Sequence, residues 1–310
     1  MILPVIISSF FLSILTLSFS QKLFLRKKIF DEINLRSSHN SIATRSGGLS
    51  IYIVLIIISI YFYINSIEIF NFSILVPLSI LFFVGIYDDF YKVDFKLKFI
   101  FQIIVAKIII DNGFIIDNFH GFIGVYEINR VLAQLVTLFI IVSIINAINL
   151  IDGIDGLLSS ITLLFIIAYE FFASVNTDFY FLSLIIITSL IPLYYFNFRK
   201  TKKIFLGDSG SYLLGGIIAV YVLNILSVGY RIRPEFDINK IILLVSILIY
   251  PIIDVIRVFT LRLMNKKSPF IADKNHIHHN LLKYNKSHFK TTFLICCFTI
   301  VTVVFIQLIF

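Results

Sequence analysis

Cysteine is almost absent from this chain, with 2 among 310 residues. Cys296 and Cys297 are neighbours inside the last hydrophobic run, so a framework of structural disulfides is excluded and a place in the packed interior is the simpler interpretation. Charged residues are also scarce, at 14% of the chain, against about 25% in ordinary globular domains. This scarcity excludes a soluble globular fold.

Most of the chain consists of long apolar runs separated by short polar segments. Hydrophobic residues make up 59% of the chain. A helix that crosses a bilayer needs about 20 mostly apolar residues, because hydrocarbon offers no hydrogen-bond partner to the backbone. We therefore predict an all-α polytopic membrane protein, one domain over residues 1–310, with ten spans at 2–20, 47–64, 70–87, 97–114, 131–149, 157–173, 180–196, 212–228, 241–261 and 292–309.

Other common features are missing as well. The first apolar run has no basic segment before it and no small-residue cleavage site after it, so we expect a retained helix rather than a secretory signal. No internal repeat, low-complexity linker or nucleic-acid-binding module is visible in the sequence. We therefore expect a membrane protein that binds no nucleic acid.

Lysine and arginine are distributed unevenly between two sets of loops. If loops alternate across the membrane, one set (21–46, 88–98, 149–156, 197–211 and 262–291) holds 20 basic residues and the other holds four. Cytoplasmic loops carry the basic excess in membrane proteins. This places the first set in the cytoplasm and predicts both termini outside. The net charge of +8 then belongs to loops beside anionic lipid head groups.

The polar residues that could carry chemistry fall mainly in the cytoplasmic set of loops. Carboxylates at a membrane boundary are costly unless they are solvated, paired or bound to a cation. Each one alone could be a solvated helix end, but their gathering at one face is typical of a functional site. The motifs are Ser37–Gly48, Gly85-Ile86-Tyr87-Asp88-Asp89, Asn146-Ala147-Ile148-Asn149-Leu150-Ile151-Asp152-Gly153-Ile154-Asp155-Gly156, Phe205-Leu206-Gly207-Asp208-Ser209-Gly210-Ser211 and His276-Ile277-His278-His279.

The aspartates of these motifs would repel one another if helix packing brought them into one cleft. Some would then take up protons, or a hard cation would neutralise them, and oxygen ligands with nearby water suit Mg²⁺ or Mn²⁺ better than zinc. The segment around Asp208 also suits phosphate, because Gly207 and Gly210 permit close approach of backbone amides and the following helix N-terminus favours an anion. The aspartates are Asp88, Asp89, Asp152, Asp155 and Asp208.

Three interpretations of the histidine motif stay open. His276, His278 and His279 could bind a diphosphate, could hold zinc or could form a structural cluster. No cysteine lies at a matching spacing and Asp273 is the one acid that does, whereas three lysines lie in the same loop. Imidazole and ammonium donors suit phosphate oxygens, so diphosphate binding is the favoured interpretation.

Taken together, the motifs resemble those of the polyprenyl-phosphate N-acetylhexosamine-1-phosphate transferases, in family order from Ser37 to about Leu282. The resemblance implies a membrane enzyme that transfers a sugar 1-phosphate from a UDP-sugar to undecaprenyl phosphate and releases UMP. It also implies a requirement for Mg²⁺ or Mn²⁺ and a place in the bacterial inner (plasma) membrane, with the active site at the cytoplasmic face. A homodimer stays open.

By matching position, the resemblance also implies roles for residues. Asp208 resembles the metal-binding aspartate, and Asp88 and Asp89 resemble the pair that receives or deprotonates the lipid phosphate, with the base undecided between them. Lysines at cytoplasmic helix ends are common, so Lys96 and Lys98 carry less weight. The positions that resemble substrate-binding residues are Asn149, Asp152 and Asp155 for the nucleotide, Phe205 for uracil stacking, His276, His278 and His279 for the diphosphate, and the basic residues Arg45, Lys96 and Lys98.

The segment Arg36-Ser37-Ser38-His39 and the short histidine element resemble the enzymes that start surface polysaccharides such as the O-antigen of lipopolysaccharide. The phospho-N-acetylmuramoyl-pentapeptide transferase of peptidoglycan synthesis, which usually has a different early loop, is the alternative within the family. A membrane transporter is the alternative from another class. It would need acids near mid-membrane that are accessible from both faces.

A few positions depart from the family pattern or need their own interpretation. Thr44 stands where the family often has proline, and Lys274 where many members have arginine, which keeps the charge but loses the bidentate fork. Asp254 and Arg257 are three residues apart inside a predicted span, so a local ion pair accounts for both. The pattern Pro251-Ile252-Ile253-Asp254 also occurs in the family, which leaves a site-supporting role for Asp254 open.

Overall fold

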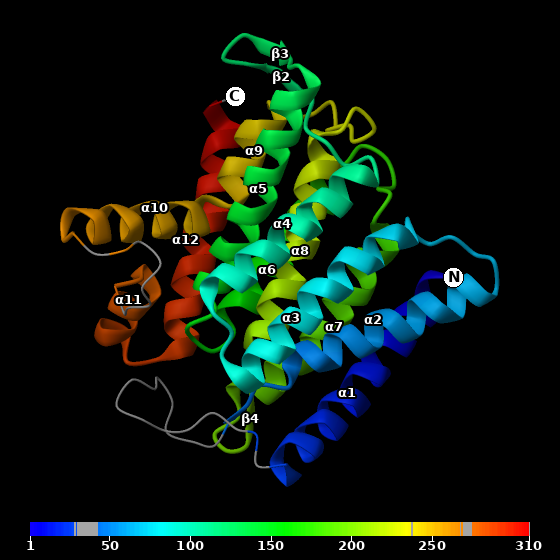
Figure 1. Cartoon of the computed structure of the whole chain (residues 1–310), viewed down its shortest axis with the longest axis vertical. Helices are drawn as coiled ribbons and strands as arrows, with labels where there is room; N and C mark the ends of the chain where they lie inside the picture. The colour runs from blue at the N-terminus through cyan, green and yellow to red at the C-terminus, as the bar shows by residue number, and fades with distance from the viewer. Residues whose placement is uncertain (28, 30–42, 237, 267, 269–274, 310) are drawn as a thin grey trace.

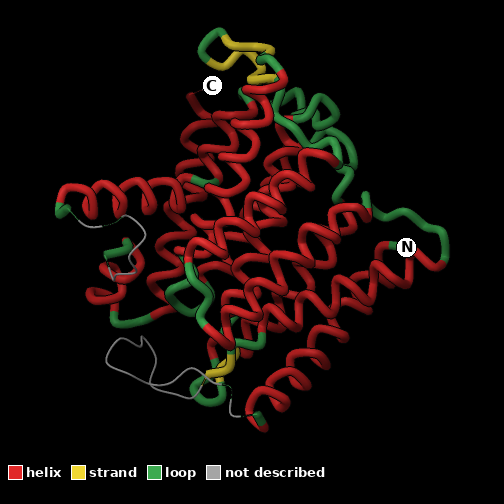
Figure 2. Tube along the Cα trace, viewed as in Figure 1, coloured by secondary structure: helices red, strands yellow, loops and turns green. Residues whose placement is uncertain are grey.

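The computed structural model describes the chain apart from residues 28, 30–42, 237, 267, 269–274 and 310. Its regular structure is almost entirely helical, and the strands form two small pairs at opposite ends of a helix bundle (Figures 1 and 2). The helices are α1 (Ile2–Arg26), α2 (Gly47–Ile64), α3 (Leu75–Tyr91, preceded by a short 3-10 helix at Phe72–Ile74), α4 (Phe95–Asp111), α5 (Arg130–Leu150), α6 (Leu157–Phe172), α7 (Tyr180–Phe198), α8 (Gly207–Leu226), α9 (Lys240–Ile247), α10 (Ile249–Met264), α11 (Ile277–Asn285) and α12 (His288–Ile309). The strands are β1 (Ala43–Thr44), β2 (Asn118–Phe122), β3 (Val125–Glu127) and β4 (Lys203–Ile204).

Every predicted span overlaps a helix, which confirms the all-α prediction. Within the described ranges, seven helices are long and apolar enough to cross a bilayer, or up to eight when α9 and α10 are counted as one bent span. Helices α4 and α6 have 17 and 16 residues. At 1.5 Å per residue each is about 25 Å long, short of the roughly 30 Å of hydrocarbon. The fold is that of an all-α polytopic membrane protein, and the number of ten spans stays a prediction.

The predicted span 241–261 is not one straight helix. Helix α9 ends at Ile247, α10 begins at Ile249, and the two axes differ by 71°. Pro251 lies in the first turn of α10, where its fixed φ and missing N–H favour the start of a helix over its continuation. Figure 1 shows α10 leaving the bundle sideways. The predicted span is therefore a bent pair of helices, and its crossing of the membrane stays a prediction.

Helix α8 is the central helix of the bundle. Every residue from Ser209 to Leu226 is buried. The helix packs against α2, α3, α5 and α6. A helix that is apolar all round belongs in such a position. A Cβ on Gly215 would lie 3.1 Å from the Cα of Ile145 in α5, and one on Gly216 would lie 2.5 Å from Cδ1 of Leu81 in α3. Small residues thus let the helices approach closely.

One end of the bundle gathers segments that are far apart in sequence. Helices α3 and α5 end there, α8 begins there, and the parallel pair of β1 and β4 lies beside them (Figure 1). The antiparallel hairpin of β2 and β3 lies at the opposite end, near the C-terminus. The polar motifs that the sequence separates by long apolar runs are therefore brought to one end of the molecule.

Candidate active site

Gly85 brings the end of α3 against the start of α8. A Cβ at this position would lie 2.4 Å from the backbone oxygen of Asp208 and 2.5 Å from the Cα of Ser209, so a side chain cannot be accommodated without moving a helix. The contact places Asp88 and Asp89, in the last turn of α3, beside Asp208, in the first turn of α8. The structure thus brings these two aspartate motifs together.

Asp89 occupies the N-terminus of α8. Its carboxylate accepts hydrogen bonds from the backbone N–H groups of Asp208 at 2.9 Å and Ser209 at 3.0 Å, and Nη1 of Arg45 lies 3.7 Å away. A helix N-terminus favours a nearby anion. We expected a phosphate of the substrate at this helix end. For these two amides the expectation is wrong, because the protein's own carboxylate already accepts from them.

Arg45 and Phe205 are positioned by a short backbone ladder. Strands β1 and β4 pair in parallel. Beyond the strands, the N–H of Phe205 donates to the carbonyl of Thr44 at 2.8 Å, and the N–H of Gly47 donates to the carbonyl of Phe205 at 2.9 Å. Both backbone polar groups of Phe205 are therefore fixed, and its side chain is half-buried. The same ladder holds Arg45 within reach of Asp89.

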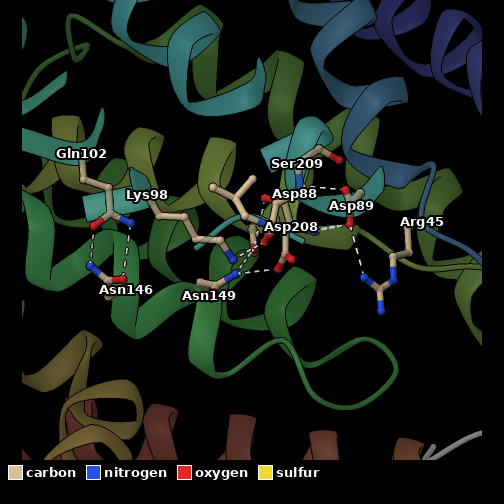
Figure 3. Close-up of polar contacts among 11 residues, drawn as sticks. Arg45, Asp88, Asp89, Lys98, Gln102, Asn146, Asn149, Asp208 and Ser209 are labelled. Atoms are coloured by element: carbon tan, nitrogen blue, oxygen red, sulfur yellow. Dashed lines mark hydrogen bonds and ion pairs between the residues drawn. The ribbon is translucent and has the colours of Figure 1, made fainter. Parts of the chain in front are cut away.

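Asp88 and Asp208 lie close together across the contact between α3 and α8 (Figure 3). Asp88 also pairs with Lys98 of α4 and accepts a hydrogen bond from the N–H of Val93 at 2.6 Å. Asn149, in the last turn of α5, donates to Asp208 at 2.9 Å. Two carboxyl groups, one amide and one ammonium group from four helices thus share one site.

Helix α4 contributes Lys98 to this site, whereas the side chain of Lys96 is exposed to solvent. One turn further along α4, Gln102 exchanges hydrogen bonds of 2.7 and 3.3 Å with Asn146 of α5 (Figure 3). This amide pair holds α4 against α5. It therefore supports the placement of Lys98 beside Asp88.

Asp152 and Asp155 lie in the turn between α5 and α6 and have different surroundings. Burial opposes the charge of Asp155, but His288, whose Nδ1 lies 3.3 Å away, and Lys203 hold the pKa of this carboxyl below its usual value. Burial, with the charges of Asp89 and Asp155, raises the pKa of Asp152 to about 7. Asp155 therefore joins the turn to β4 and α12. Asp152 lies within electrostatic reach of the carboxylate group formed by Asp88, Asp89 and Asp208.

The histidine motif packs directly against this turn. A Cβ at Gly153 would lie 2.3 Å from Nε2 of His278 and 3.2 Å from Cε1 of His279. His276 is the N-cap residue of α11, and its ring stacks on that of His278 at 5.3 Å. The three predicted histidines are thus together, at the edge of the turn that carries Asp152.

Asp254 contacts the histidine motif rather than forming the local pair that its spacing predicts. Its Oδ2 lies 2.6 Å from Nδ1 of His276. Arg257 instead donates to the backbone carbonyl of Asn275 at 2.5 Å. The alternative interpretation, in which Asp254 supports a site, therefore fits the observed contacts better.

Some predicted positions lie outside the described residues, namely the segment 36–39, Asp273 and Lys274. Conversely, Tyr250, Lys203 and His288 contact predicted residues but were not singled out from the sequence. Lys203 and His288 are separated from Asp155 by 48 and 133 residues along the chain. No spacing in the sequence could indicate these partners, because they depend on how β4 and α12 pack.

Comparisons with known proteins agree with the motifs. The sequence model of glycosyl transferase family 4 matches residues 71–226, half of the chain. A probable undecaprenyl-phosphate N-acetylglucosaminyl 1-phosphate transferase of Bacillus subtilis is 32% identical over 263 residues, which cover 83% of this chain and 71% of that protein. The chain belongs to glycosyl transferase family 4.

Two further relatives of this glycosyl transferase family 4 protein have related names. An undecaprenyl-phosphate alpha-N-acetylglucosaminyl 1-phosphate transferase of Pasteurella multocida is 30% identical over 294 residues, 90% of this chain and 78% of that protein. A decaprenyl-phosphate N-acetylglucosaminephosphotransferase of Mycobacterium leprae is 29% identical over 241 residues, 72% of this chain and 60% of that protein. The family suggested by the motifs is thus confirmed.

The glycosyl transferase family 4 site contains donors that suit a hard divalent cation. Asp88 and Asp208 bring two carboxyl groups close together, and oxygen donors of this kind are the ligands that Mg²⁺ and Mn²⁺ prefer. Across the described residues, the group that places three possible ligand atoms within 4.8 Å of one another is Asp254, His276 and His278. Its two Nδ1 atoms already contact protein partners. Asp208 beside Asp88 is the better chemical fit for the expected cation, because Mg²⁺ and Mn²⁺ prefer oxygen ligands, whereas imidazole nitrogens suit zinc.

Proposed function

We propose that this protein transfers an N-acetylhexosamine 1-phosphate from a UDP-sugar to undecaprenyl phosphate and releases UMP. The observation that carries the proposal is the meeting of Asp88, Asp208 and Asn149 at one end of an apolar bundle. The names of the three relatives, all polyprenyl-phosphate N-acetylglucosaminyl phosphotransferases, support the same reaction. N-acetylglucosamine is therefore the first sugar to test.

In the proposed reaction, an oxygen of the lipid phosphate forms a bond to the sugar-bound phosphorus of the UDP-sugar. The bond between that phosphorus and the oxygen leading to UMP breaks, and this oxygen leaves with UMP. Phosphoryl transfer depends mainly on positioning and on stabilisation of spread-out charge. The protein therefore has to hold two phosphorylated substrates in line and supply donors to their oxygens.

Asp88 is better suited than Asp89 to take a proton from the lipid phosphate. Both carboxylate oxygens of Asp89 accept from backbone amides of α8, so its removal would disturb the helix that carries Asp208. Asp88 accepts one backbone hydrogen bond, from Val93, and its other oxygen pairs with Lys98, an ammonium group that suits a phosphate oxygen. We therefore assign the base to Asp88 and a positioning role to Asp89.

The remaining residues are assigned by their neighbours. Asp208 would hold Mg²⁺ or Mn²⁺, which would supply positive charge to the diphosphate when bound. Asn149, Asp152 and Phe205 are assigned to the nucleotide. We assign Asp155 a supporting role, because its carboxylate is paired with Lys203 and His288. The three histidines and Arg45 are assigned to phosphate oxygens.

We place the site at the cytoplasmic face of the bacterial plasma membrane. Among the described residues, the basic segments between α3 and α4 and around β4 lie at one end of the bundle, and UDP-sugars are made in the cytoplasm. The polyprenyl chain of the acceptor would lie in the hydrocarbon region beside the bundle. Initiation of a surface polysaccharide is the pathway step that this product would serve.

The test is UMP release by purified protein in detergent, with undecaprenyl phosphate, Mg²⁺ and a panel of UDP-N-acetylhexosamines that includes UDP-N-acetylmuramoyl-pentapeptide. We expect lipid-dependent release of UMP from one donor and its loss when EDTA is added. Release from the muramoyl-pentapeptide donor alone would move the protein to the peptidoglycan branch. If folded protein releases no UMP from any donor, the proposed reaction is rejected and ion transport becomes the function to assay.

A further inference from the structure

The parallel pair of β1 and β4 has only two residues in each strand. Two strands this short cannot keep their geometry by themselves, because a two-stranded pair is marginal even when it is longer. The backbone bonds that flank the pair hold Phe205 on one side. On the other side, β4 is held by side chains of α1 and α7, two helices whose last turns lie beside it.

Three successive carbonyl groups at β4 accept hydrogen bonds from side-chain amides. Nε2 of Gln21, in α1, donates to the carbonyl of Lys202 at 2.6 Å and to that of Lys203 at 3.4 Å. Nδ2 of Asn197, in α7, donates to the carbonyl of Ile204 at 2.7 Å. Both amide side chains are buried. Loss of either one would leave a carbonyl of this segment with fewer partners and would cost free energy.

The orientation of the Gln21 amide is fixed by the chemistry of its neighbours. Nη2 of Arg199 donates to Oε1 of Gln21 at 2.9 Å and to the carbonyl of Lys202 at 2.7 Å. A guanidinium group can only donate and a carbonyl group can only accept. The amide oxygen of Gln21 must therefore face Arg199, and its nitrogen must face the backbone of β4.

The turn before β4 needs such support. Lys202 has a φ of +50°, in the left-handed region that a lysine rarely adopts. A backbone in that region persists where the surrounding contacts impose it. The bonds from Gln21 and Arg199 to the Lys202 carbonyl supply this constraint. They thus set the direction in which the chain leaves the turn and runs toward Phe205.

We propose that Gln21 and Asn197 are positioning residues, which hold β4 from α1 and α7 and so place Phe205 for the nucleotide of the UDP-sugar. Neither residue touches the substrate, and both act through the backbone of β4. This inference rests on the proposed function, which assigns Phe205 to the nucleotide. It adds a task for α1, a helix to which no predicted site residue belongs.

The test compares Gln21→Leu, Gln21→Glu and Asn197→Leu with wild-type protein in detergent. We measure the Kd of UMP by isothermal titration calorimetry, the KM of the UDP-sugar and of undecaprenyl phosphate, and the temperature of thermal unfolding. The matched control is Ser13→Ala. Ser13 is also buried in α1 and donates to the Ser189 carbonyl of α7 at 2.9 Å, so this variant loses one bond between the same two helices without touching β4.

We expect Gln21→Leu and Asn197→Leu to raise the Kd of UMP and the KM of the UDP-sugar about fivefold, the order expected from one lost hydrogen bond. The KM of undecaprenyl phosphate should stay unchanged. Gln21→Glu keeps an acceptor for Arg199 but loses the donor to β4. It should therefore unfold near the wild-type temperature and still weaken UMP as Gln21→Leu does. Ser13→Ala should bind UMP as wild type does.

A double-mutant cycle tests whether the effect passes through Phe205. If Gln21 acts by placing that ring, Gln21→Leu should weaken UMP no further once Phe205→Leu is present, because the two changes remove the same contribution. Losses that add in full would show that Gln21 acts elsewhere, and the inference would be rejected.

Other results would also overturn it. An equal rise in the KM of both substrates would mean a general structural role. Wild-type affinity for UMP in Gln21→Glu and Asn197→Leu would mean that β4 needs no such bonds. UMP binding is measured without turnover, so the two proposals can fail separately. If the variants weaken UMP but wild-type protein turns over no donor, the reaction fails and the positioning role stands. If wild-type protein binds no UMP, both are rejected.

Discussion

Asp88 and Asp89 are neighbours in sequence, yet their carboxylates point to different partners. Successive residues on a helix are rotated by about 100°. Asp89 therefore reaches the amides at the start of α8, whereas Asp88 reaches Lys98 and Asp208. The motif in the sequence predicts that both acids lie near the chemistry. It could not separate their roles, because the separation depends on where α8 and α4 pack against α3.

We predict that Asp208→Asn reduces kcat for UMP release by about 100-fold, the size of effect seen when one electrostatic contact to a reacting group is removed. The apparent Mg²⁺ requirement should also rise, because one carboxyl ligand is lost. Both are measured by steady-state kinetics over a series of Mg²⁺ concentrations. Asp111→Asn, an exposed acid at the far end of α4, is the matched control and should behave as wild type. Normal turnover of Asp208→Asn at limiting Mg²⁺ would remove Asp208 from the metal site.

Asp152 and Asp155 predict opposite pH effects on stability. The pKa of Asp152 is raised to about 7, so the native state holds a proton that the unfolded state releases above its ordinary pKa near 3.8. Stability is then lost as pH rises toward 7 and beyond. Asp152→Asn should therefore unfold at a higher temperature than wild type at pH 8, and the difference should shrink toward pH 5, measured in EDTA.

The matched variant is Asp155→Asn. The pKa of Asp155 is lowered, so its charge stabilises the native state above its ordinary pKa, and this contribution is lost as pH falls. Asp155→Asn should unfold at a lower temperature than wild type at pH 8, because Lys203 and His288 lose their partner. If the unfolding temperatures of both variants shift in the same direction from wild type at pH 8, the opposite pKa shifts assigned to Asp152 and Asp155 are wrong.

At the scale of helices, the apolar runs predict where helices lie, because the backbone N–H and C=O groups of each run must find their hydrogen-bond partners within one element. They do not predict bends, since apolar residues continue on both sides of Leu248. The contact of Asp254 with His276 was missed for a different reason. Asp254 and Arg257 lie three residues apart in α10, so spacing alone favours that pair, whereas the contact with His276 depends on how the start of α11 packs beside α10.

Gly85 offers a test of helix packing. A methyl group there would meet the backbone of α8 at 2.4 Å, which cannot move without displacing Asp208. We predict that Gly85→Ala costs about 1–3 kcal/mol of stability, as overpacking does elsewhere, and lowers kcat as well. Gly216→Ala is the control, because its methyl group would meet the flexible end of Leu81 instead. Thermal unfolding and UMP release measure both variants, and equal tolerance of the two would contradict the packing argument.

For the whole molecule, the distribution of basic residues and the placement of the polar motifs point to the same end of the bundle. The end of the bundle that carries β4 is the end where α3 and α5 finish and α8 starts (Figure 1). Of the basic loops, the described segments between α3 and α4 and around β4 lie at the same end, whereas the hairpin of β2 and β3 lies at the other. A single orientation therefore accounts for the distribution of lysine and arginine and for access of a cytoplasmic nucleotide sugar to the carboxylate group.

This orientation predicts which surface positions an impermeant thiol reagent reaches in intact cells. Ile123 is 84% exposed in the turn of the β2–β3 hairpin, and Lys202 is exposed beside β4. After Cys296 and Cys297 are replaced by serine, Ile123→Cys should be labelled in spheroplasts with an intact plasma membrane, and Lys202→Cys only once that membrane is permeabilised. The opposite pattern would place the carboxylate group outside, where no UDP-sugar is made, and the proposed reaction would have to be abandoned together with the topology.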